Sequence, residues 1–78
     1  MFKRYVDVVV YHDKRGEIHP LFMKWENKTY KIEESECIGM RNSPVGATGV
    51  LYLCNIQGKQ RNLYYEKKTR WFVESSRP

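Results

Sequence analysis

The fold is decided by VLYLCNIQGKQRNLYYE, residues 50–66, in which two strand-like runs flank a short turn. In residues 50–56, apolar side chains occupy both alternating faces, which is typical of a strand that is covered on both sides. Gln57-Gly58-Lys59 is expected to turn, because glycine accepts the positive φ that closing a hairpin demands. Side chains again alternate in character along residues 60–66. The stretch therefore predicts a β-hairpin at the core of a sheet.

Four more runs alternate in the same way and are predicted strands: residues 4–12, 17–25, 29–34 and 70–74. Polar turns separate them, one ending in Gly16 and one containing Asn27, which tolerates the left-handed conformation. Pro20 cannot donate a ladder hydrogen bond, so its part of the strand is expected at a sheet edge or a bulge.

The weakest signal lies between residues 32 and 49. Residues 32–40 have room for a helical turn or two, although no segment shows a sustained helical spacing of apolar residues. Residues 42–49 are rich in turn formers and are predicted to form the longest loop, either mobile or functional.

Six short strands joined by tight turns predict an all-β fold, a six-stranded antiparallel meander that curls into a small SH3-like barrel. Pairing of sheet edges in a homodimer is the alternative way of covering them. At 78 residues the chain has room for one small domain, expected over residues 1–74, with a polar C-terminal tail at residues 75–78.

Cysteine content and hydropathy indicate a cytoplasmic protein. The chain has only two cysteines, Cys37 and Cys54, and its N-terminus lacks the apolar run of a secretory signal. No apolar stretch approaches the roughly 20 residues that a membrane-spanning helix needs. We therefore expect a reduced environment and no membrane partner.

Residue types that carry chemistry are scattered. The candidate metal ligands are His12, His19, Cys37 and Cys54, and none stands in a recognised ligand spacing. Cys37 is expected to be a packing residue at a strand end, and Cys54 a small buried apolar residue. The sequence thus predicts no catalytic, cofactor or metal site, and no enzyme.

The formal net charge of +5 lies entirely in the second half of the chain. Residues 1–39 hold seven basic and seven acidic side chains, whereas residues 40–78 hold seven basic and two acidic ones. Basic and aromatic residues interleave there, as in small β-barrels that bind single-stranded nucleic acid. The alternative is that these charges only keep the domain in solution. The possible nucleic-acid contacts are Lys59, Arg61, Tyr64, Lys67, Lys68 and Arg70.

Leu21, Met23 and Trp25 form an apolar row on the strand that contains Pro20. Such a row beside a sheet edge is a possible protein interface, for another protein or a second copy of the chain. Equally, it could face the interior of a barrel. We expect a non-enzymatic binding or assembly module, with weak, sequence-tolerant nucleic-acid binding as the alternative.

The chain resembles a family of small bacterial all-β proteins that has no assigned activity. The resemblance lies in VDVVV (residues 6–10), IHPLFMKWENKTYKI (18–32), LYYE (63–66) and WFV (71–73). They resemble the family's pattern of a strand, a glycine turn, a Pro-x-x-Phe-x-Trp strand, a Tyr-x-Val strand and a final strand with Trp. In this chain Phe22 lies one residue closer to Pro20 than in that pattern, and Asn27-Lys28 stand where the family has a glycine. The resemblance implies a bacterial, cytoplasmic all-β protein.

Overall fold

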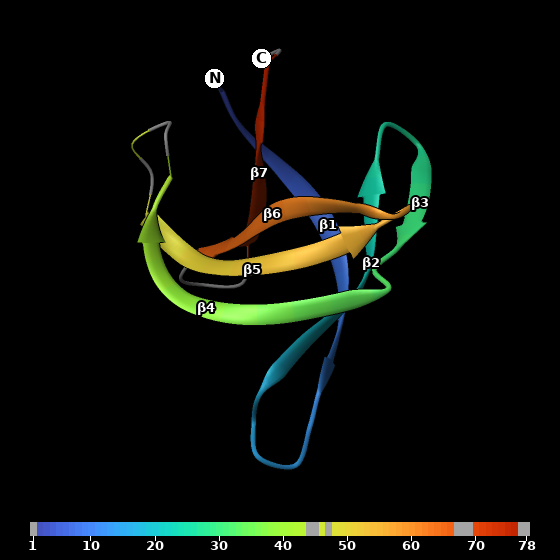
Figure 1. Ribbon diagram of the computed structural model, residues 1–78, viewed down its shortest axis with the longest axis vertical. Coiled ribbons are helices and arrows are strands. Elements are labelled where there is room, and N and C mark those ends of the chain that lie inside the picture. The colour runs from blue at the N-terminus through green and yellow to red at the C-terminus, as the bar shows by residue number, and fades with distance from the viewer. Residues whose placement is uncertain (1, 44–45, 47, 67–69, 77–78) are drawn as a thin grey trace.

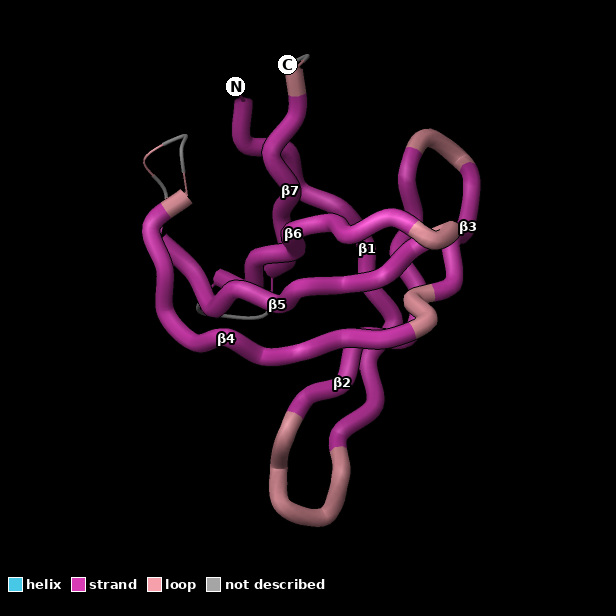
Figure 2. Tube along the Cα trace, in the orientation of Figure 1, coloured by secondary structure: helices cyan, strands magenta, loops and turns pink. Residues whose placement is uncertain are grey.

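A computed structural model describes residues 2–43, 46, 48–66 and 70–76 (Figure 1). The described residues form seven β-strands joined by turns, without a helix (Figure 2). The strands are β1 (Phe2–His12), β2 (Ile18–Trp25), β3 (Lys28–Lys31), β4 (Glu34–Asn42), β5 (Thr48–Ile56), β6 (Lys59–Glu66) and β7 (Arg70–Ser75). The predicted all-β class is thus confirmed, although the number of strands is seven and not six.

All strand pairs are antiparallel, in the order β3-β2-β1-β7-β6-β5-β4. Two meanders, β1 to β3 and β4 to β7, meet where β1 pairs with β7 from Phe2–Ser75 to Val6–Trp71. The order therefore differs from a simple meander, because the first strand pairs with the last. Ser75 belongs to β7, so the polar tail expected from residue 75 starts at least one residue later.

β4 was not predicted as a strand, because a helical turn and the start of the longest loop were expected there. β4 pairs with β5 along its whole length, from Glu34–Asn55 to Asn42–Thr48, with a bulge between Cys37 and Gly39. Because β4 is the last strand of the sheet, only Ile38 and Gly39 are even half-buried. A strand with so few buried positions shows no apolar alternation in its sequence. Residues 44, 45 and 47 of the expected loop lie outside the described residues.

The sheet curls into a half-barrel (Figure 1). Its two outermost strands, β3 and β4, are joined by Ile32 and Glu33 alone. The main-chain N–H of Ile32 donates to Leu21 O at 2.8 Å, on the β2 side, and the next N–H, of Glu33, donates to Asn55 O at 2.8 Å, on β5. This short link brings the two ends of the sheet together, so the sheet must curl.

One face of the curled sheet holds the main core, to which every second residue of β5 contributes. Buried members are Ile32, Tyr52, Cys54, Ile56, Leu63 and Trp71. Half-buried side chains such as Val6, Val8 and Val10 of β1 pack against them. Trp71 lies at the centre, with ring centroids 5.2 Å from Tyr52 and 4.7 Å from Tyr65. The aromatic rings therefore supply much of the buried area of this small domain.

Pro20 lies at a bulge, as predicted. The register of β1 against β2 shifts between Val9, which pairs with Phe22, and Val10, which pairs with Pro20. Leu21 is the extra residue, so the alternation of β2 changes phase there. The predicted turns also form: Gly16, Asn27 and Gly58 have φ values of 82°, 67° and 74°.

Candidate functional site

A groove of about 540 Å³ opens between the β2–β3 hairpin, β6 and the end of β7. This volume lies within the range of about 300–1,000 Å³ typical of ligand pockets. Apolar and aromatic side chains form one wall and polar residues of the β5–β6 hairpin the other. The lining residues are Met23, Trp25, Tyr30, Ile56, Gln57, Lys59, Gln60, Arg61, Asn62, Leu63, Val73 and Glu74.

The groove exists because β6 and β7 separate. Their ladder contains only the pairs Tyr64–Phe72, Tyr65–Trp71 and Glu66–Arg70. Beyond Tyr64, β6 stays with β5 as far as the Ile56–Lys59 pair, whereas β7 stays with β1. On the side away from β5, residues 59–63 therefore have no partner strand among the described residues.

The turn that connects β5 to β6, at Gln57 and Gly58, decides which main-chain groups face the groove. Gln57 and Gly58 both have positive φ, 52° and 74°, which defines a two-residue type I′ turn. Such a turn is closed by a hydrogen-bonded pair, here Ile56–Lys59, and pairs then alternate along the hairpin. Gln60 and Asn62 are consequently in non-hydrogen-bonded pairs with β5, and their N–H and C=O groups point away from β5 into the groove.

The electrostatics of the polar wall are mainly positive. Lys59 and Arg61 are exposed, and neither forms an ion pair with any residue in the described ranges. Glu74 is the acid of the groove; its Oε1 accepts a hydrogen bond from the Tyr64 hydroxyl at 3.2 Å. Its Oε2 is shielded from solvent and has no hydrogen-bond partner within the described structure. Within the described part of the chain, the groove thus offers two cations without an ion-pair partner and one carboxylate oxygen without a hydrogen-bond donor.

The apolar wall consists of half-buried side chains of the β2–β3 hairpin, with Met23 paired across to Tyr30. The guanidinium of Arg4 lies 4.3 Å from the centre of the Trp25 ring, and it also donates to Glu26 at 3.3 Å. One face of Trp25 is therefore already covered by a cation. The wall is better suited to apolar contact than to stacking of a base between free rings.

The predicted nucleic-acid contacts that lie within the described ranges do not form one surface. Lys59 and Arg61 line the groove, but Tyr64 is buried, with 3% of its surface exposed. The Tyr64 ring stacks on Phe72, so it is not available to stack on a base as the sequence analysis expected. Lys67 and Lys68 lie outside the described residues.

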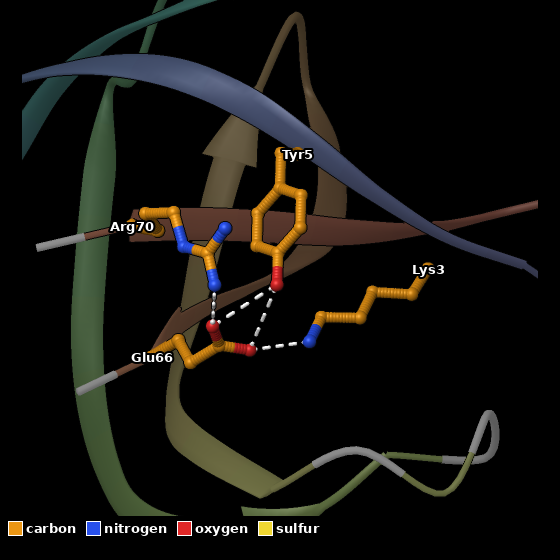
Figure 3. Close-up of polar contacts among 4 residues, drawn as sticks. All are labelled: Lys3, Tyr5, Glu66 and Arg70. Atoms are coloured by element: carbon orange, nitrogen blue, oxygen red, sulfur yellow. Dashed lines mark hydrogen bonds and ion pairs between the residues drawn. The ribbon is translucent and has the colours of Figure 1, made fainter. Parts of the chain in front are cut away.

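Arg70 takes part in a separate cluster that joins β1 to β6 and β7 (Figure 3). Glu66 accepts hydrogen bonds from Arg70 Nη2 at 3.0 Å, from the Tyr5 hydroxyl at 3.0 Å and from Lys3 Nζ. The hydrogen bond from Lys3, together with the other donors, holds the pKa of Glu66 below its ordinary value of 4.5. The same hydrogen bond to Glu66 raises the pKa of Lys3 above its ordinary value. Arg70 also stacks on the Tyr5 ring at 4.3 Å. The charge of Arg70 is thus used in contacts with Glu66 and with Tyr5, which attach β1 to β6 and β7.

Leu21, Met23 and Trp25 do not form the continuous row that alternation predicted. The bulge at Leu21 leaves this side chain 39% exposed, whereas Met23 and Trp25 turn toward the groove. Leu21 instead lies next to Phe22, which is 38% exposed and pairs with exposed Val9. The groove therefore combines two residues of the expected protein interface with two of the expected nucleic-acid contacts.

One cluster of ligand-type residues was not predicted: Asp13, Glu17 and His19, whose ligand atoms lie within 4.8 Å of one another. Both oxygens of Asp13 are already used. Oδ1 accepts from the N–H groups of Arg15 and Glu17, and Oδ2 lies 2.9 Å from His19 Nε2. The contact with His19 lowers the pKa of Asp13. These hydrogen bonds indicate that the cluster stabilises the turn between β1 and β2.

The two cysteines differ in environment. Cys37 is exposed within β4, so the prediction of a packing residue at a strand end is wrong, whereas Cys54 is 1% exposed in the core. Burial raises the pKa of the Cys54 thiol to about 11, so this group is protonated at neutral pH. Cys54 is a packing residue, as expected from its place in the sequence.

Comparison with protein-family models, with curated proteins and with solved structures gives no match to this chain. The fold and the groove therefore define its class by themselves: a small all-β half-barrel with an open strand edge. No helix in the described ranges is long and apolar enough to span a membrane.

Proposed function

We propose that the protein is a non-enzymatic binding module that holds a segment of a partner protein in the groove between β6 and the β2–β3 hairpin. In this proposal it works in the bacterial cytoplasm and presents its groove as SH3-like modules do, on a strongly curled small sheet. The observation that carries the proposal is that one groove is lined both by apolar Met23 and Trp25 and by the cations Lys59 and Arg61, which have no ion-pair partner among the described residues.

Three features favour a protein segment over nucleic acid. The Tyr64 ring is buried, one face of Trp25 is covered by Arg4, and Arg70 is paired with Glu66. A single-strand binder needs free rings beside its cations, since stacking supplies about 1–3 kcal/mol per base. The groove offers mainly an apolar wall, main-chain groups and two cations, and these are the elements of peptide recognition.

A second copy of the chain is a weaker candidate for the partner. Each copy carries a net charge of +5, which opposes association at low ionic strength. Light scattering over a concentration series tests this option directly. A dimer at micromolar concentration would support self-association, which a monomer at the highest concentration would contradict.

The proposal is tested by selecting peptides from a random library with the wild-type protein. Binding of the selected peptides is then measured by fluorescence anisotropy with two charge-reversal variants, Arg61→Glu in the groove and Arg15→Glu on the exposed β1–β2 turn. We expect Arg61→Glu to weaken binding about tenfold or more, with Arg15→Glu nearly unchanged. Equal effects of both variants, or no enriched peptide, would overturn the proposal.

The same protein should be titrated with labelled single-stranded DNA and RNA at two salt concentrations. Binding that weakens steeply as salt rises, with a larger loss in Arg61→Glu than in Arg15→Glu, would favour nucleic acid as the ligand. The present proposal expects no such binding.

A further inference from the structure

The free edge of β6 identifies how a partner would bind, an inference that rests on the proposed function. We propose that the partner segment is an extended, acidic peptide that adds to the sheet as a new strand along residues 59–63 of β6. Addition of a strand to an exposed edge is a recurring mode of peptide recognition, in which main-chain bonds give affinity and side-chain pockets give specificity.

The main chain supplies the first argument. The N–H and C=O groups of Gln60 and Asn62 face the groove and are spaced as an incoming strand requires, because every second residue of a strand bonds to the same neighbour. The Tyr64–Phe72 pair continues this set, since Tyr64 bonds toward β7. An added strand would therefore occupy the position that β7 leaves when it diverges.

The side chains supply the second argument. Lys59, Arg61 and Leu63 lie on one face of β6, because side chains alternate along a strand. In a strand added along the edge of β6, the side chains on the same face of the sheet would lie directly opposite these three residues. Two acidic residues two positions apart in the added strand would face Lys59 and Arg61. An apolar residue two positions further along would face Leu63 and contact the wall formed by Met23 and Trp25.

Glu74 determines what the other face of the added strand should carry. Its Oε2 is shielded and lacks a hydrogen-bond donor within the described structure, and a buried acceptor without a donor is costly. Residues of the incoming strand on this side should be uncharged donors such as threonine. Acidic residues there would be repelled by the Glu74 carboxylate.

Two acetylated and amidated peptides test the proposal. Their sequences, Thr-Glu-Thr-Glu-Thr-Val-Thr and the reverse Thr-Val-Thr-Glu-Thr-Glu-Thr, cover both directions of the strand. We expect at least one to bind and to slow amide hydrogen exchange at Gln60 and Asn62 about tenfold or more. Lysine in place of glutamate should abolish binding, and N-methylation of single amides should weaken it at alternate positions only, since alternate amides face β6.

Variants of Asn62 test the same contact from the protein side. Asn62→Pro removes the N–H that faces the groove but leaves the bonds to β5, whereas Asn62→Ala removes the side chain and keeps the N–H. We expect loss of binding only in Asn62→Pro, provided that its circular dichroism matches wild type. If Asn62→Pro does not fold, the N-methylated peptides give the answer alone.

The strand proposal is overturned if neither peptide slows exchange at Gln60 and Asn62, or if N-methylation is tolerated at every position. In either case, library-selected peptides that bind wild type and lose affinity in Arg61→Glu would still support the proposed function. Such peptides would then bind through side chains or as a helix.

Discussion

The rings of Tyr64 and Phe72 stack in parallel, with centroids 4.9 Å apart and 6° between their planes. They lie on the face of the sheet opposite the main core, where the Tyr5 ring meets Phe72 edge-on at 6.3 Å. The main chain of β5 closes this cluster at Gly49, where an added Cβ would lie 3.1 Å from the Tyr65 carbonyl oxygen. The half-barrel therefore has a second small core at the position where β6 and β7 still pair.

Phe72→Ala should lower the free energy of unfolding by about 3–5 kcal/mol, because Phe72 is fully buried and the cavity cannot collapse against a paired strand. Phe72→Leu should cost less, since it keeps most of the buried volume. Urea denaturation followed by tryptophan fluorescence measures both. An effect below about 1 kcal/mol for Phe72→Ala would mean that this cluster is not a core.

Acid should weaken the attachment of the N-terminal strand through Glu66. The pKa of Glu66 is depressed in the folded protein, so its contribution to stability is present above the ordinary value of 4.5 and is lost as pH falls through the lower folded value. We expect Glu66→Gln to be less stable than wild type near neutral pH, with the difference vanishing as the pH falls below the depressed pKa of Glu66.

The control for this experiment is Glu34→Gln on β4, whose carboxylate makes no ion pair within the described structure. Thermal unfolding at several pH values gives the two difference curves. A stability difference between wild type and Glu66→Gln that stays constant from neutral to acid pH would show that the Glu66 charge is not what stabilises the cluster.

The β5–β6 turn sets the register in which β6 pairs with β5. One substitution in this turn should lower the stability of the protein and another should raise it. Gly58→Ala should destabilise the protein by about 1–2 kcal/mol, because φ of 74° is strained for a residue with a Cβ. Gln57→Asn should stabilise it by about 0.5 kcal/mol, because asparagine accepts the left-handed conformation of a type I′ turn. Chemical denaturation measures both changes. If the free energy of unfolding changed in the same direction in both variants, the type I′ assignment of the turn would be wrong.

The two thiols should react at very different rates with an aromatic disulfide reagent. A pKa raised from 9.0 to about 11 lowers the thiolate fraction of Cys54 about a hundredfold, and burial slows the reaction further. In a Cys37→Ser variant, Cys54 should react only when the protein unfolds, whereas Cys37 in a Cys54→Ala variant should react at once. Rapid reaction of Cys54 in the native protein would contradict its place in the core.

The parts of the fold that could be predicted are those with strong alternation. Residues 50–66 form the expected hairpin, and Pro20 lies at the expected bulge, because a buried face and a missing N–H group can both be read from the sequence. The hairpin is not central in the sheet, since β5 is the second strand from one end. The sequence of β4 shows no such alternation, since this edge strand buries few of its side chains. The pairing of β1 with β7 joins residues about 70 positions apart, and no local pattern carries that information.

The candidate site could be predicted only in part. Trp25, Met23, Lys59 and Arg61 were named from the sequence, but as members of two different surfaces. Their meeting depends on the curl of the sheet and on the separation of β6 from β7, which are tertiary features. The burial of Tyr64 depends on the neighbouring Phe72 in the same way.

The most direct test of the binding groove is chemical-shift mapping by two-dimensional NMR of the ¹⁵N-labelled protein with a library-selected peptide. We predict that the large amide shifts fall on the residues lining the groove, chiefly Met23, Trp25, Tyr30 and residues 59–63. Shifts concentrated on exposed Val9, Tyr11, Leu21 and Phe22, or spread without pattern, would contradict the account.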